Sequence, residues 1–384
     1  MANTLTDLIP SIYNALDVVS REVVGFIPAV TMDAQYTRAA VGQEVISPVA
    51  PEVAAKDISP AVNAPDDGDQ NIGNVKMTIN KARGVPIRWN GEEQLGVNNN
   101  GAQYNVIFSN QMVQAMRTLV NEIESDIAGT YIAASRAYGT AGTTPFGTDT
   151  SELMQARKIL VDNGASQGDL QAVLDTGAGA NLRTLYGINT DRDWSNVPMN
   201  ERGVLVTPHG MSVRESGQVV IPTVGTGASA TTDNAGYDVG DTVITLASAG
   251  TGTTVAGDVI TFAGDDNKYV VAAGDTDVSD GGTITLAKPG LKQAIATSAT
   301  AITVISAGPR SLVFARSAIA LATRAPALPE QGDSAVDSMM VTDPLSGLTF
   351  EVRVYAQYRQ VRYEVAAAWG TKAVKPEHMA LLLG

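Results

Sequence analysis

The chain has 384 residues, of which 44% are hydrophobic and 17% charged, so it is a globular protein long enough for two or three folding units. Its 26 lysines and arginines against 40 acidic residues give a net charge of −14, which argues against non-specific binding to nucleic-acid phosphates. It has no cysteine and two histidines, which excludes disulfides, thiol catalysis, thiolate metal sites and a multi-histidine metal site within one chain.

No leader or membrane segment is expected. The first residues lack the positive charges of a secretory signal, and the apolar stretch 311–328 is interrupted by Arg316 and Arg324. We therefore expect a soluble protein that is not exported.

An amphipathic helix is predicted over residues 5–26, where apolar residues recur three or four apart until Pro28 ends the pattern. A terminal helix of this kind needs a partner surface, in its own chain or in a neighbour. We assign residues 1–43 to an N-terminal helical arm.

A long two-stranded excursion is predicted over residues 44–97. Four prolines punctuate its outgoing half, residues 66–69 form an acidic tip, and residues 74–83 alternate as a returning strand. A hairpin of this length is rarely stable alone and usually leans on another chain. A solvated surface loop is the alternative.

The longest predicted helix begins at Gly101 and keeps an apolar face as far as Tyr131. About thirty residues at ~1.5 Å each would span roughly 45 Å, which is longer than a typical globular helix. We assign residues 98–140 to this helix and its surroundings.

Residues 141–221 predict alternating helices and strands. A helix is expected over 152–163, with Ser151 as its N-cap and Gly164 just past its end. The expected elements that follow are a strand over 169–174, a turn at 177–180 and a short helix from Asn181.

The composition changes over residues 222–307, where nine aspartates occur without a glutamate and Thr, Val, Ile and Gly dominate. Three phrases of alternating apolar residues predict strands at 240–247, 257–263 and 282–287, and Tyr269–Val271 adds a fourth. Their unequal spacing argues against a solenoid and favours a small β-barrel or sandwich. We predict an autonomous β domain.

Mixed character returns over residues 308–384. The predicted elements are strands at 312–315, 348–355 and 360–365, with a short helix or extended link at 317–322. Because the region before Val220 offers no evident local partners for these strands, the β domain is expected to be inserted into a discontinuous host.

No catalytic, metal or cofactor site is predicted, and the protein is not expected to be an enzyme. Residues 164–168 match the G-x-S-x-G pattern around Ser166, but a helix precedes the serine and a strand follows it, the reverse of a nucleophile elbow. Residues 177–179 lack the third glycine and the lysine of phosphate-binding loops. The aspartates of 222–307 form no calcium-binding loop and are explained by turns.

The order of these elements resembles the major capsid (coat) protein of tailed bacteriophages, with the Hong Kong 97-type fold. More narrowly, it is similar to the P-twenty-two type, whose axial domain carries an inserted β domain. The resemblance rests on three sequence segments: Val255–Gly264, Leu312–Ile319 followed by Pro326–Pro329, and the closing segment Tyr363–Glu377.

The resemblance implies an α+β fold with an N-arm, an extended E-loop at 44–97, and a peripheral domain built on the spine helix at 98–140. Residues 141–221 and 308–384 would complete the peripheral and axial domains around the insertion. It further implies hexamers and pentamers in an icosahedral virion capsid around double-stranded DNA, with scaffolding and portal proteins as partners and assembly in the host cytoplasm. No cofactor is implied.

Charged residues of the excursion are candidate inter-subunit contacts. We expect Asp66, Asp67 and Asp69 to face basic residues of an adjacent subunit, and Lys81, Arg83 and Arg88 to face acidic ones. Two other functions stay open: a surface adhesin or phage tail component, suggested by the Thr/Gly/Asp-rich region, and a serine hydrolase, which rests on Ser166 alone.

Overall fold

The computed structural model describes residues 25–49, 57–58, 60, 73–99, 104–188, 208–342 and 347–384. All but the last two residues of the predicted N-terminal helix therefore lie outside the described residues, and so does the acidic tip at 66–69.

A six-stranded sheet is built from both ends of the chain. Its strands are β1 (Thr31–Ala39), β4 (Lys81–Asn90), β14 (Ile319–Pro326), β15 (Asp337–Thr342), β16 (Thr349–Gln357) and β17 (Gln360–Ala373). They are arranged in the order β1-β14-β17-β16-β15, and β4 also pairs with β17. The 14-residue β17 is antiparallel to β4, β14 and β16, and thereby joins the two halves of the sheet.

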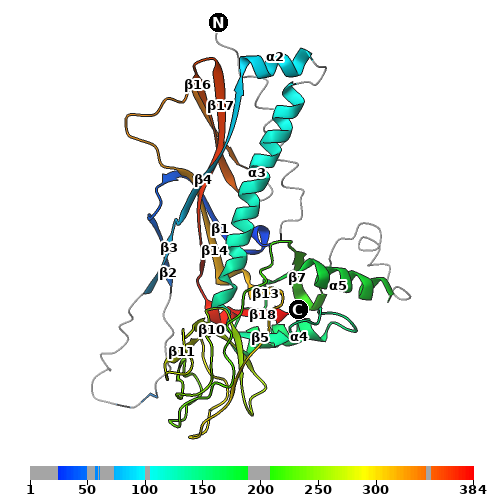
Figure 1. Ribbon diagram of the computed structural model, residues 1–384, viewed down its shortest axis with the longest axis vertical. Helices are drawn as coiled ribbons and strands as arrows, with labels where there is room; N and C mark the ends of the chain where they lie inside the picture. Colours follow the sequence, from blue (N-terminus) through cyan, green and yellow to red (C-terminus); the bar gives the residue numbers. More distant parts are fainter. Residues whose placement is uncertain are drawn as a thin grey trace.

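The long helix α3 (Tyr104–Ala128) runs along β4 and β17 of this sheet (Figure 1). Its buried stripe includes Phe108, Met112, Met116, Leu119, Ile123 and Ile127. Phe108 packs on Tyr363 of β17 with ring centroids 4.6 Å apart. The α-helix has 25 residues, about 37 Å, and gives way to a 3₁₀ turn, η3 (Gly129–Ala133), where Gly129 lowers helix propensity. The short α2 (Gly91–Asn99) precedes it.

A two-stranded hairpin leaves this sheet. β2 (Glu44–Val49) and β3 (Gly73–Thr78) pair antiparallel, as predicted for the excursion. Met77 and Ile79 at the hairpin root pack on the small residues Ala322 and Ala368. Residues 81–90 of the predicted excursion do not belong to this hairpin among the described residues. They form β4, which pairs with β17.

A second sheet of ten strands carries the rest of the chain. Its strands are β5 (Arg136–Gly139), β6 (Leu170–Leu174), β7 (Met211–Glu215), β8 (Val243–Thr245), β9 (Val259–Phe262), β10 (Lys268–Ala273), β11 (Thr283–Leu286), β12 (Ile302–Val304), β13 (Arg310–Ala315) and β18 (Met379–Leu383). The order is β12-β9-β10-β5-β18-β13-β6-β7, with β11 on β10 and β8 on β11. Helix α4 (Ser151–Asp162) packs on β5, β13 and β18, and α5 (Thr176–Ile188) contacts β7. The remaining 3₁₀ turns are η2 (Ile27–Ala29), η5 (Pro208–Gly210), η6 (Arg316–Ala318) and η7 (Pro376–His378).

Each strand phrase predicted within 222–307 contains a strand, namely β8, β9, β10 and β11. Their inward side chains form a separate hydrophobic cluster that includes Ile244, Phe262 and Ile284. This region is nevertheless joined to its host, because β10 pairs with β5 and the Arg136 guanidinium donates to Asn267 Oδ1 at 3.0 Å. The strands of the two parts therefore form one continuous sheet.

Two helix starts differ from the prediction. α5 begins at Thr176, so residues 177–180 lie in a helix and not in a turn; the Asp175 carboxylate accepts the Gly177 N–H at 2.9 Å and caps the helix there. Ser151 is the first helical residue and Thr150 is the N-cap; the Ser151 N–H donates to Asp149 Oδ1 at 2.8 Å. Gly164 does follow α4, with φ +79°.

The expectation that the region before Val220 offers no partners for the C-terminal strands is wrong. β1 pairs with β14, β4 with β17 and β6 with β13. β1 was missed because its sequence does not alternate strictly, and its register on β14 shifts between Ala34 and Arg38. The ambiguous segment 317–322 is the turn η6 followed by the start of β14.

Candidate functional site

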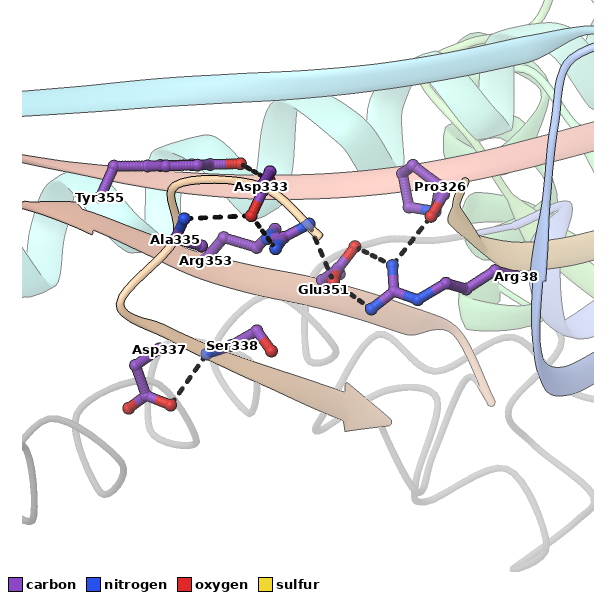
Figure 2. Close-up of polar contacts among 9 residues, drawn as sticks. All are labelled: Arg38, Pro326, Asp333, Ala335, Asp337, Ser338, Glu351, Arg353 and Tyr355. Atoms are coloured by element: carbon purple, nitrogen blue, oxygen red, sulfur yellow. Dashed lines mark hydrogen bonds and ion pairs between the residues drawn. The ribbon is translucent and has the colours of Figure 1, made fainter. Parts of the chain in front are cut away.

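A charged network fastens the strand that enters the hairpin to the middle of the six-stranded sheet (Figure 2). Arg38, near the end of β1, donates to both carboxylate oxygens of Glu351 on β16, at 3.0 and 2.6 Å, and to the Pro326 carbonyl at 2.9 Å. The Glu351 side chain is 2% exposed and that of Arg38 30%. The hydrogen bonds to Glu351 raise the pKa of Arg38 above its ordinary value, so the guanidinium stays protonated.

The network continues to the connection between β14 and β15. Arg353 donates to Asp333 Oδ1 at 2.6 Å, and its Nη1 lies 3.9 Å from Glu351 Oε1. The Tyr355 hydroxyl donates to Asp333 Oδ2 at 3.0 Å, and the Ala335 N–H donates to Oδ1 at 3.0 Å. The Ala335 N–H, helped by Tyr355 and Arg353, holds the pKa of Asp333 below its ordinary value. Asp333 therefore tethers this connection to β16.

The other end of β1 is fastened in a similar way. Arg324 on β14, with a side chain 5% exposed, donates to the Asp33 carbonyl at 2.6 Å and to Asp33 Oδ2 at 2.9 Å. The Thr31 hydroxyl donates to the Arg316 carbonyl at 3.0 Å. β1 is thus held on both sides of its register shift, where the regular ladder is interrupted.

A buried carboxylate of α3 holds the first described residues. Glu124, 2% exposed, accepts the backbone N–H groups of Ile27 at 2.7 Å and Phe26 at 3.1 Å, and the Ser216 hydroxyl at 2.9 Å. Burial raises the pKa of Glu124, and the Ile27 and Phe26 N–H groups oppose that rise. The N-terminal segment is therefore anchored to the long helix at this point.

Two of the predicted contact residues have acidic partners in their own chain. Lys81 lies 2.7 Å from Asp126 Oδ1, and the other oxygen of Asp126 accepts the Trp369 indole N–H at 2.7 Å. Arg83 lies 3.8 Å from Glu122. Both acids belong to α3, so these cations tie β4 to the helix that covers it.

The third cation, Arg88, is exposed, and within the described ranges it has no hydrogen bond or ion pair. Asp66, Asp67 and Asp69 lie outside the described residues. The inter-subunit roles stay predictions.

Sequence reasoning missed the network around Glu351. Glu351 and Arg353 occupy the polar positions of an alternating strand, which ordinarily face solvent, yet they are 1% and 7% exposed. No local signal distinguishes a buried ion pair from an exposed charge, because the partner Arg38 is more than 300 residues away in the chain.

Among the described residues, no hydrogen bond joins Ser166 to a histidine or to an acidic side chain. The ring of His209 is bonded to the Thr150 hydroxyl at 2.9 Å, and its carbonyl accepts Arg157 at 2.5 Å. Across the described part of the chain, no three His, Asp or Glu side chains gather as a metal site would need. Nor does any helix in those ranges have the length and hydropathy to span a membrane. Apart from Arg88, the charged groups described above are bonded to other segments of the chain and hold them together.

Neither a protein-family model nor a curated protein matches this sequence. Solved structures are similar along most of the chain. The capsid of cyanophage P-SCSP1u is similar over 92% of this chain and 86% of its own, with 12% identity and a TM-score of 0.48. A virus-like particle from Pyrococcus furiosus is similar over 98% and 100%, with 9% identity and a TM-score of 0.45. The capsid of a native GTA particle is similar over 94% and 90%, with 9% identity and a TM-score of 0.45. Phage capsids are thus among the solved structures that this chain is similar to.

Proposed function

We propose that this protein is the major capsid protein of a tailed bacteriophage, a structural subunit that assembles into an icosahedral shell around double-stranded DNA. The observation that carries the proposal is the hairpin β2–β3, whose two strands pair only with each other among the described residues. Its root, in contrast, is fixed by ion pairs that each have one buried member and by packing on the six-stranded sheet.

An isolated two-stranded hairpin is only marginally stable in water. Ile46 on the outgoing strand is 57% exposed, and the Glu44–Lys76 pair beside it is 2.9 Å long with both side chains about half exposed. An exposed pair of this kind contributes only about 0–1 kcal/mol. The β2–β3 hairpin therefore gains its stability from a neighbouring subunit. In a closed shell, every copy has such a neighbour.

The resemblance adds the partners. Hexamers and pentamers form the shell, a scaffolding protein guides assembly in the host cytoplasm, and a portal protein occupies a vertex. The inserted β region supports the host domain and contacts neighbouring capsomers. A subunit with net charge −14 does not clamp the phosphates of the packaged genome, so the DNA is free to leave. The protein has no enzymatic role in this scheme.

Expression of the full chain with and without a scaffolding protein tests the proposal. We expect closed particles of uniform size when lysates are sedimented through a gradient and examined by electron microscopy. A protein that stays monomeric at every concentration, with any scaffolding protein, contradicts the proposal.

A further inference from the structure

The outer strands of the six-stranded sheet differ in how their free edges are protected. Among the described residues β4 pairs only with β17, and it contains Pro86, which has no N–H to offer a further strand, together with several lysines and arginines. The register of β1 on β14 is interrupted between Ala34 and Arg38. Prolines, basic side chains and irregular registers of this kind keep the edges of sheets from pairing with other chains.

The edge strand β15 has none of these protections. It pairs with β16 in an uninterrupted register from Asp337 to Thr342, ends the sheet within the described ranges, and contains no proline, lysine or arginine. Val336, directly before it, is 67% exposed, and Met339 and Met340 are partly exposed. An unprotected edge of this kind is a template on which another strand can pair.

One hydrogen bond shows which backbone groups of β15 face outward. The Ser338 N–H donates to Oδ1 of the adjacent Asp337 at 2.8 Å (Figure 2), so it points away from β16. Because backbone groups alternate in direction along an antiparallel strand, the N–H and C=O groups of Ser338, Met340 and Thr342 lie on the outer side together. These groups form a row of donors and acceptors along the edge.

We propose that β15 pairs antiparallel with β15 of a second copy of the chain, about a two-fold axis at Met339. The inference rests on the proposed shell function and adds a contact that joins the sheets of two subunits edge to edge. In this register Ser338 lies opposite Met340 of the second copy, and each exchanges backbone hydrogen bonds with the other. Asp337 lies opposite Val341, so the two acids of the paired strands do not face each other.

Charge favours a second copy as the strand that pairs here. With a net charge of −14, two copies repel each other wherever their acidic surfaces meet. β15 has a single acid, Asp337, at its first residue, and the contact is made by neutral backbone groups. Every subunit carries the same strand, so both halves of the contact are present in equal number.

Disulfide cross-linking of the full chain tests the pairing. The chain has no cysteine, so Met339→Cys introduces one thiol per copy. Across the proposed axis the two Cα atoms would be about 4.5 Å apart, which a disulfide can span. After mild oxidation, particles of this variant should run largely as covalent dimers on a non-reducing gel. Ala82→Cys, at an exposed position of the protected strand β4, is the matched control and should stay monomeric on that gel.

Two further measurements probe the edge itself. Ser338→Lys places a cation on an exposed position of the edge, so it should lower the dimer yield of the Met339→Cys chain about fivefold without lowering the melting temperature of the unassembled subunit. Ala82→Lys should leave that yield unchanged. In the unmodified chain, the outward amides of Met340 and Thr342 should exchange about tenfold more slowly in particles than in the unassembled subunit.

Particles in which Met339→Cys gives no dimer, and in which the Met340 and Thr342 amides exchange as in the unassembled subunit, overturn the inference and leave the shell function standing. A cross-linked band that contains a different protein identifies another occupant and also overturns it. If the unmodified protein forms no particles, the shell function fails. Dimer formation by Met339→Cys in concentrated solution then supports the edge contact by itself, and absence of that dimer overturns it.

Discussion

Single buried charges hold separate segments of the fold together. Glu351, Arg353, Arg324 and Glu124 are each at most 7% exposed, and each is bonded to a group far away in the sequence. Removing such charges from water is costly, and the cost is offset only where the geometry is good and the partner is present. These contacts therefore tie segments together only in the complete fold.

Arg38→Ala should destabilise the subunit by about 3–5 kcal/mol, because it leaves the Glu351 carboxylate buried with only Arg353 Nη1 nearby, at 3.9 Å. Denaturant unfolding of the unassembled protein measures the loss. Lys76→Ala is the matched control, since it breaks an exposed pair in the same region and should cost less than about 1 kcal/mol. Equal losses in the two variants would show that the Arg38–Glu351 pair has no special role.

Acid should release the connection that Asp333 tethers. The pKa of Asp333 is lowered in the folded protein, so its contribution to stability is present above the ordinary value of 3.8 and is lost as the pH falls through the folded pKa. Hydrogen exchange at the Ala335 N–H, corrected for the intrinsic effect of pH, should rise below about pH 4. Asp333→Asn should show the faster exchange already at pH 7. Unchanged exchange in this variant would mean that other contacts hold the connection.

At the scale of elements, acidic residues close together on α3 bind three separate segments: β4, β17 and the first described residues. Glu122 and Asp126 face the cations of β4, Asp126 also accepts the indole of Trp369 on β17, and Glu124 on another side holds the first described residues. The position of the hairpin root relative to the N-terminal segment is therefore set through the helix. The apolar stripe predicts that a helix forms here. The three carboxylates determine which segments are bonded to that helix.

The β region at residues 222–307 should fold when expressed alone. Its own cluster of buried side chains, from Ile244 to Ile302, supplies a core, and about 85 residues exceed the ~40 below which domains need staples. We expect β-type circular dichroism and a cooperative melt. A random-coil spectrum with collapsed amide NMR signals would show that the pairing of β10 with β5 is required.

At the scale of the whole molecule, strands from the first and last hundred residues pair within one sheet. β1 and β4 near the N-terminus are completed by β14 to β17 near the C-terminus, so the sheet that roots the hairpin forms only after nearly the whole chain is present. Such non-local pairing folds slowly, since the entropy of loop closure is lost before the contacts form.

Local pattern was enough to predict the elements whose residues repeat. The stripe of α3, the alternation in β8 to β11 and β16, and the pairing of β2 with β3 depend on neighbours within a few positions or across one excursion. Composition by itself likewise excludes whole classes of chemistry, because the chain has no cysteine and only two histidines.

Tertiary structure alone decided which distant segments meet. β1 does not alternate and is a strand because β14 pairs with it, and Lys81 and Arg83 face α3 because β4 lies on β17 beneath that helix. Glu351 occupies a position that the pattern assigns to solvent, yet it is buried and paired with Arg38. Burial and pairing depend on partners up to about 300 residues away, and a short-range pattern carries no information about them.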